Sequence, residues 1–156
     1  MSNIYEQFNE EFNVKDFAKE VAELEKNKSG VFEKVPYGKY EVSVEEMKLT
    51  KSKTKGEPMV SICFKVIDGE FENRKIYMNK VVVYPKWLHD MNEFLRSMVV
   101  KCKNAPAIKF DTWDQYGYML LDVHEAIDGS FEFGLNYYAD SKMYDAFEIT
   151  DVFTLD

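Results

Sequence analysis

The sequence predicts a mainly β domain of the α+β class, with an OB-type antiparallel barrel and a helix in the middle of the chain. Short runs of alternating apolar and polar residues predict the strands, and one segment with helical spacing separates the third run from the later ones. The length of 156 residues fits one domain. Because an OB-fold is a five-stranded Greek-key barrel, we expect five or six strands. A half-open sheet packed on the helices is the competing architecture.

An amphipathic helical segment is expected ahead of the barrel, over residues 1–30. Apolar residues recur three or four positions apart, at Tyr5, Phe8 and Phe12 and again from Val14 to Leu24. Packing against the protein's own core is the simpler role for this segment, and a partner-binding arm is the alternative. The barrel domain then occupies residues 35–156.

Three strands and two hairpins follow. The first strand starts near Tyr37, where the apolar period changes to two, and ends at a lysine-rich polar loop over Lys51–Pro58. The second strand covers Val60–Val66, and Asp68-Gly69 after it predicts a tight hairpin turn. The third strand runs from about Arg74 to Tyr84.

A helix from Pro85 to about Lys101 interrupts the strands. Pro85 suits a first helical position, and the residues after it are apolar at helical spacing. We expect Tyr84 and Trp87, at the entrance of this helix, to be buried in the core. The strand pattern resumes over Tyr118–Ile127. It turns at Asp128-Gly129 and ends with one or two more strands, whose apolar residues are Phe131, Phe133, Leu135, Tyr137, Phe147, Ile149 and Val152.

The charge distribution predicts one cationic surface on an acidic body. The chain carries a net charge of -8, yet residues 34–110 hold fifteen basic residues against nine acidic ones. Residues 111–156 hold one lysine against eleven acidic residues. A local positive field can attract a polyanion despite a negative net charge. Charges that segregate only along the sequence, and mix on the surface, are the alternative.

Enzymatic chemistry is not expected from this sequence. Cys63 and Cys102 form no zinc-ligand cluster, His89 and His124 have no partner at a catalytic spacing, and the glycines form no phosphate-binding loop. We therefore expect no cofactor, no metal and no catalytic residue. No signal peptide or transmembrane run is found, so an intracellular protein without a membrane partner is expected.

The middle third combines the two ingredients of a single-strand binding surface. Such surfaces hold the phosphates with cations and stack the bases on aromatic rings. If Ile76 and Met78 face the core, then Lys75, Tyr77 and Asn79 share the opposite face, and Tyr77 becomes the stacking residue. Lysines in hairpin loops also keep strand edges soluble, which is the alternative reading of the loop. The candidate DNA-binding residues are Lys48, Lys51, Lys53, Lys55, Lys65, Arg74, Lys75, Tyr77, Asn79 and Lys80.

Three segments also resemble a family of phage proteins. They are Val35–Val44, Lys51–Val60 and Gly69–Ile76, and the helical run Asn92–Ser97 is similar as well. The resemblance is to phage proteins long catalogued as a domain of unknown function and regarded as single-stranded-DNA-binding-like. It implies an OB-type, non-enzymatic protein that coats single-stranded DNA in phage replication or recombination, in the cytoplasm of the bacterial host. In many such proteins a flexible acidic tail ends the chain, whereas Ala146–Asp156 reads as a final strand.

We therefore expect sequence-tolerant binding of single-stranded DNA. Expected protein partners are phage or host replication or recombination proteins. The alternative is a phage-encoded acidic interaction module or inhibitor that binds a basic host or phage protein. The sequence leaves open the site size, the choice between DNA and RNA, and whether the protein forms a homo-oligomer.

Overall fold

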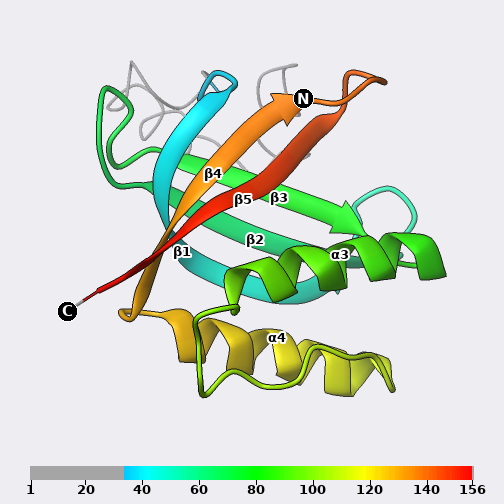
Figure 1. Ribbon diagram of the computed structural model, residues 1–156. Coiled ribbons are helices and arrows are strands. Elements are labelled where there is room, and N and C mark those ends of the chain that lie inside the picture. Colours follow the sequence, from blue (N-terminus) through cyan, green and yellow to red (C-terminus); the bar gives the residue numbers. More distant parts are fainter. Residues whose placement is uncertain (1–33, 156) are drawn as a thin grey trace, which may run out of the picture. The chain divides into compact units, whose positions relative to one another are not determined.

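A computed structural model describes residues 34–155, which form an antiparallel sheet with two helices (Figure 1). The elements are β1 (Gly38–Lys51), β2 (Pro58–Val66), β3 (Lys75–Val81), α3 (Pro85–Met98), α4 (Trp113–Ile127), β4 (Phe131–Ala139) and β5 (Asp145–Thr154). This confirms the mainly β, α+β class. The predicted helical segment over residues 1–30 lies outside the described residues. None of the helices in residues 34–155 has the length and apolar character that crossing a membrane requires.

The sheet is open, so the predicted closed barrel is wrong and the competing half-open sheet is what forms. Its strand order is β3-β2-β1-β4-β5, which leaves β3 and β5 as edges. Lysine side chains, rather than a neighbouring strand, satisfy carbonyls of β5: Lys80 Nζ lies 2.6 Å from Asp145 O, and Lys101 Nζ lies 2.8 Å from Val152 O. Charged side chains at an edge oppose further strand pairing.

The long first strand belongs to both halves of the sheet. Its start pairs with β4 over Gly38–Val42, and its later part pairs with β2 as far as Lys51. The register with β2 shifts between Val44 and Glu46, which makes a β-bulge at Glu45. A bulge bends a strand and increases its twist. This bend accompanies the strong curvature of β1 in Figure 1.

The two hairpins of the first half differ in how well the sequence predicted them. The lysine-rich loop joins β1 to β2 as expected, and Ser52 closes it by bonding to Glu57. The connection from β2 to β3 is longer than a tight turn at Asp68-Gly69, because it covers residues 67–74. Both Gly69 and Asn73 have positive φ there, and the Asn73 amide bonds to Val66 O at 2.7 Å.

Helix α4 replaces the strand predicted over Tyr118–Ile127. Tyr116, Leu120, Val123 and Ile127 are buried at intervals of three and four, which is helical spacing. The Thr112 side chain caps the helix by accepting a hydrogen bond from the Gln115 amide. The prediction failed because the apolar run over residues 116–121 fits either period. A run this close to a capping threonine favours a helix.

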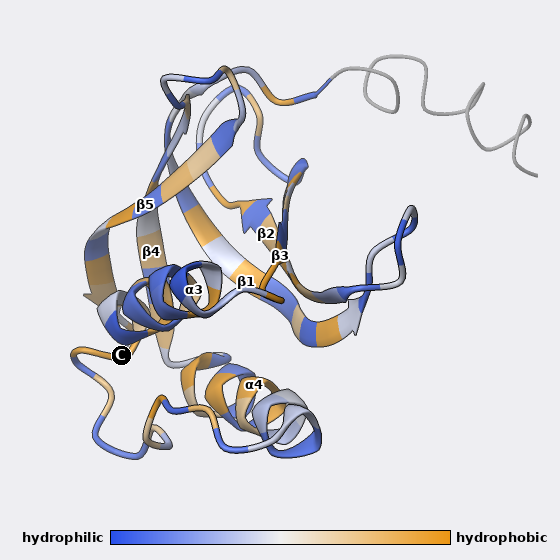
Figure 2. Ribbon diagram, turned by 90° about the vertical axis from the view of Figure 1, so that its right-hand side faces the viewer, coloured by the Kyte–Doolittle hydropathy of each residue, from blue (hydrophilic) through white to orange (hydrophobic). Residues whose placement is uncertain are grey.

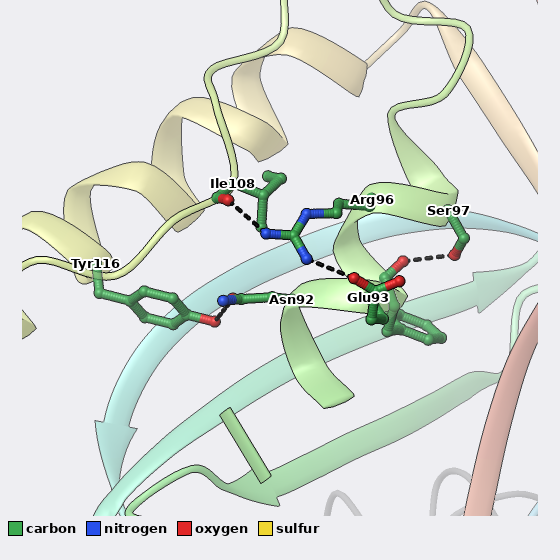
Figure 3. Close-up of polar contacts among 7 residues, drawn as sticks. Asn92, Glu93, Arg96, Ser97, Ile108 and Tyr116 are labelled. Carbon is green, nitrogen blue, oxygen red and sulfur yellow. Dashed lines mark hydrogen bonds and ion pairs between the residues drawn. The ribbon is translucent and has the colours of Figure 1, made fainter. Parts of the chain in front are cut away.

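Helix α3 begins at Pro85 as predicted and ends at Met98 instead of Lys101. Figure 3 shows how it is tied to α4 and to the connector between the helices. The Tyr116 hydroxyl donates to Asn92 Oδ1 at 2.7 Å, and Arg96 donates to Ile108 O at 2.9 Å. Both helices bury their apolar sides with the inner face of the sheet in one core.

The strands alternate as the period of two predicts, and Figure 2 shows the alternation as bands of colour along them. Residues such as Val42, Ile62 and Met78 enter the core. Their neighbours in sequence therefore lie on the opposite face, here called the outer face. That face carries five of the ten candidate residues, which are Lys48, Lys65, Lys75, Tyr77 and Asn79.

Candidate nucleic-acid interface

Strand register brings the outer-face candidates of β1, β2 and β3 into adjacent rows. Lys48 pairs with Ser61 and Ser61 with Asn79, while Lys65 pairs with Lys75. Tyr77 lies on β3 between Lys75 and Asn79, and its side chain is 57% exposed. The predicted face of Lys75, Tyr77 and Asn79 is confirmed, because Ile76 and Met78 are buried in the core.

Asn79 and Cys63 help to order the surface around Tyr77. The Ser61 hydroxyl donates to Asn79 Oδ1 at 2.7 Å, which links β2 to β3 on the outer face. Cys63 pairs with Tyr77 across the two strands. Its thiol is buried, and burial raises the pKa of Cys63. The thiol is therefore protonated at neutral pH and adds no charge beside the exposed ring.

Two carboxylates share this face with the lysines. Lys48 Nζ lies 2.7 Å from Glu46 Oε1, and Lys65 Nζ lies 3.8 Å from Glu45 Oε1. The hydrogen bond and charge of Lys48 lower the pKa of Glu46. Because all four side chains are substantially exposed, these pairs are weak and exchange with solvent. A phosphate can therefore compete with either glutamate for its lysine.

The lysine loop, residues 51–57, connects the end of β1 to the start of β2. Lys51, Lys53 and Lys55 are all exposed there. The loop has a defined shape, since the Ser52 amide bonds to Glu57 O at 2.9 Å and Gly56 adopts a φ of 64°. It thus presents three cations on an ordered turn next to β2.

Lys80 and Arg74 lie apart from the outer-face candidates. Lys80 follows the alternation of β3 to the other side of the strand, where its Nζ lies 5.4 Å from the centre of the Phe147 ring. Burial is the main cause that lowers the pKa of Lys80. Arg74 lies in the β2–β3 connection, with its guanidinium 5.4 Å from the centre of the Phe71 ring.

A hollow of about 530 Å³, here called the side groove, opens beside β3. It lies between β3, α3 and the hairpin of β4 and β5. Its apolar lining includes Phe94 and Phe147, which both contact the Phe64 ring with centroids 6.4 Å apart. A second hollow of about 410 Å³ shares Asn79, Lys80, Tyr144 and Phe147 with it and reaches Tyr77. The two hollows lead from the outer face around the edge of β3.

The hairpin loop of residues 140–144 forms the far wall of the side groove. The Asp140 carboxylate accepts hydrogen bonds from the amides of Lys142 and Tyr144, at 2.8 and 3.0 Å. Met143 has a φ of 67° in this loop. The loop is held by these backbone contacts, and the Tyr144 side chain remains 67% exposed.

Three aromatic residues near this groove were missed or misplaced by sequence reasoning. The expected burial of Tyr84 and Trp87 is wrong, because their side chains are 55% and 46% exposed. They occupy the start of α3, outside its buried side, and contact each other edge-to-face with ring centroids 4.6 Å apart. No role was predicted for Tyr144. Its position opposite an aromatic helix start depends on tertiary structure, which no sequence signal supplied.

These features define an α+β protein with a mixed-charge, aromatic-bearing sheet face and a groove along one sheet edge. The chain belongs to the family described as Protein of unknown function (DUF669), whose family model matches residues 21–125. No curated protein matches the chain, and no solved structure matches it either.

Proposed function

We propose that this protein binds single-stranded DNA with little sequence preference, through the outer face of β1, β2 and β3 and the adjacent lysine loop. The observation that carries the proposal is the exposed ring of Tyr77, which lies on the outer face between the row of Lys65 and Lys75 and the row of Lys48, Ser61 and Asn79. Single strands bind to surfaces that combine cations for the phosphates with aromatic rings for the bases. The proposed phosphate contacts are Lys48, Lys51, Lys53, Lys55, Lys65 and Lys75, with Arg74 at the β2–β3 connection.

The strand order supports an OB-type interpretation of the open sheet. The order β4-β1-β2-β3 is that of a Greek key, with both helices in the long return connection. An OB-fold is a partly open, five-stranded Greek-key barrel that binds oligonucleotides on strands 2 and 3 and on the β1–β2 and β4–β5 loops. The lysine loop and the loop of residues 140–144 occupy these two loop positions. The resemblance to phage proteins suggests a role in phage replication or recombination.

Fluorescence anisotropy of the full chain with labelled oligothymidine tests the proposal. We expect salt-sensitive binding to a single strand of roughly 16 nucleotides, and much weaker binding to the matching duplex. In the variant Lys53→Ala/Lys55→Ala, the affinity should fall roughly tenfold at low salt. The slope of log K against log salt should become shallower by about 1.4, because each lost phosphate contact contributes about 0.7.

The matched control removes two exposed lysines elsewhere. Lys103 and Lys109 lie in the connector between α3 and α4, so Lys103→Ala/Lys109→Ala changes the net charge equally without touching the proposed surface. Equal losses of affinity in the two variants would show that the effect comes from net charge and not from the proposed surface. Absence of single-strand binding at low salt would overturn the proposal.

A second candidate function is binding to a basic protein, and one observation favours it. Residues 111–128 carry five acidic residues and no lysine or arginine, and α4 exposes Tyr118 and Leu121 among them. Exposed apolar side chains with an acidic surround suit a basic protein partner. The variant Asp122→Lys/Glu125→Lys separates the candidates, since it would abolish such binding and leave DNA affinity unchanged or improved.

A further inference from the structure

The side groove differs in electrostatic character from the surface next to it. Among the described residues, Lys80 and Lys142 line it together with Asp90 and Asp140, so the formal charges cancel. An anionic phosphate therefore gains little by entering, whereas the lysine loop and outer face attract it. A hollow with an apolar floor and balanced charge suits a neutral ligand group.

The ionic groups of the groove are not equally available to a ligand. The Asp140 carboxylate is engaged by two backbone amides of its own loop, and Lys80 Nζ donates to Asp145 O. Asp90 lies on an exposed position of α3, one turn after Trp87, and its carboxylate makes no hydrogen bond or ion pair within residues 34–155. The groove thus offers one unengaged carboxylate beside one exposed indole.

The aromatic parts of the groove are held in place before any ligand arrives. Phe147 stacks on Tyr137 with ring centroids 5.2 Å apart, and Trp87 contacts Tyr84 in a T-shaped arrangement. The volume of about 530 Å³ is within the usual range of small-molecule sites. Preformed aromatic surfaces reduce the entropy lost on binding.

We propose that the side groove holds one unpaired base of the bound strand, stacked on Trp87, with its exocyclic amine donating to Asp90. The inference rests on the proposed function and adds a preference for amino-bearing bases to it. A carboxylate accepts from the N4 amine of cytosine, whereas thymine presents the O4 carbonyl at that position. The two pyrimidines have the same ring, so they form a matched pair of probes.

The test compares full-length protein binding to oligocytidine and oligothymidine deoxynucleotides of roughly 16 residues at neutral pH. We expect oligocytidine to bind more tightly on the order of tenfold, the effect of one charge-assisted hydrogen bond. The variant Asp90→Asn should lose this preference, because an amide offers both a donor and an acceptor. Asp122→Asn changes the charge by the same amount on α4, outside the groove, and should keep the preference.

A second readout follows the stacking itself. The chain has two tryptophans, Trp87 and Trp113, so Trp113→Phe leaves only the groove indole to report by fluorescence. Oligocytidine should quench it, and Trp87→Ala should weaken binding to both oligonucleotides roughly tenfold.

Each outcome bears on one proposal or both. Tight single-strand binding with no preference, or with a preference for thymidine, would overturn the groove assignment alone. Failure to bind either oligonucleotide would overturn both proposals. Quenching by a basic peptide in place of DNA would identify the groove as a peptide site.

Discussion

The Tyr116 hydroxyl makes a buried side-chain contact that joins the two helices. It donates to Asn92, and both residues are buried in the described part of the chain (Figure 3). Burial raises the pKa of Tyr116 above its ordinary value of 10.0. The neutral phenol is therefore the form on which this contact depends.

Replacement of Tyr116 by phenylalanine should lower the free energy of unfolding by about 1–3 kcal/mol, because the Asn92 acceptor stays buried without its donor. Urea denaturation measures the loss. Tyr118→Phe, at an exposed position of the same helix, is the control and should change the free energy of unfolding by less than about 0.5 kcal/mol. Equal values for the two variants would contradict the role given to this contact.

The same residue gives the protein a predictable response to alkaline pH. A tyrosine with a raised pKa in the folded state binds more protons there than in the unfolded chain above pH 10.0, the ordinary value. Its contribution is complete below that pH and is lost as the pH rises further. In denaturation at a series of alkaline pH values, wild type should lose stability more steeply than Tyr116→Phe. Parallel curves would contradict the raised pKa.

At the scale of elements, β1 contributes both a lysine and two glutamates to the outer face, and the glutamates partly neutralise its lysines. Its Glu45 and Glu46 pair with Lys65 and Lys48, at and next to the bulge. In the proposed mode of DNA binding, phosphates must displace these glutamates before they reach the lysines. Such competition lowers affinity and makes release easier.

The variant Glu45→Gln/Glu46→Gln should therefore bind oligothymidine more tightly, by roughly three- to tenfold at low salt, because no carboxylate competes with the phosphates for Lys48 and Lys65. The slope of log K against log salt should stay similar, because the same lysines contact phosphates. Anisotropy titrations at several salt concentrations measure both quantities. The control Glu132→Gln/Glu148→Gln neutralises two acidic residues on β4 and β5. Unchanged affinity in the first variant would show that Lys48 and Lys65 do not contact DNA.

Some of these elements could be predicted from the sequence and others could not. A period of two predicted β1, β2, the start of β3 and the face of Tyr77, because alternation fixes which side of a half-buried strand enters the core. The third strand ends at Val81 instead of near Tyr84. It failed for α4, where the apolar run from Tyr116 fits a strand as well as a helix. The side groove was beyond prediction, since β3, α3 and the loop of residues 140–144 meet only in the folded sheet.

At the scale of the whole molecule, one unit contains all the surfaces described. The chain divides at Val35, and nearly all of the described residues belong to the unit Val35–Asp156. The core found among the described residues lies within the second unit, as do the outer face, the lysine loop and the side groove. The first 34 residues carry five lysines and eight acidic residues, so residues 35–156 carry -5 of the total -8.

A chain of residues 35–156 should therefore fold by itself and keep the proposed affinity for single-stranded DNA. We expect a single cooperative transition in thermal denaturation, because the core found among the described residues is contiguous within this unit. At low salt its affinity should equal or slightly exceed that of the full chain, since three net negative charges are removed. Circular dichroism and anisotropy measure the two properties. Cooperative folding with a loss of affinity beyond tenfold would assign part of the DNA surface to the first 34 residues.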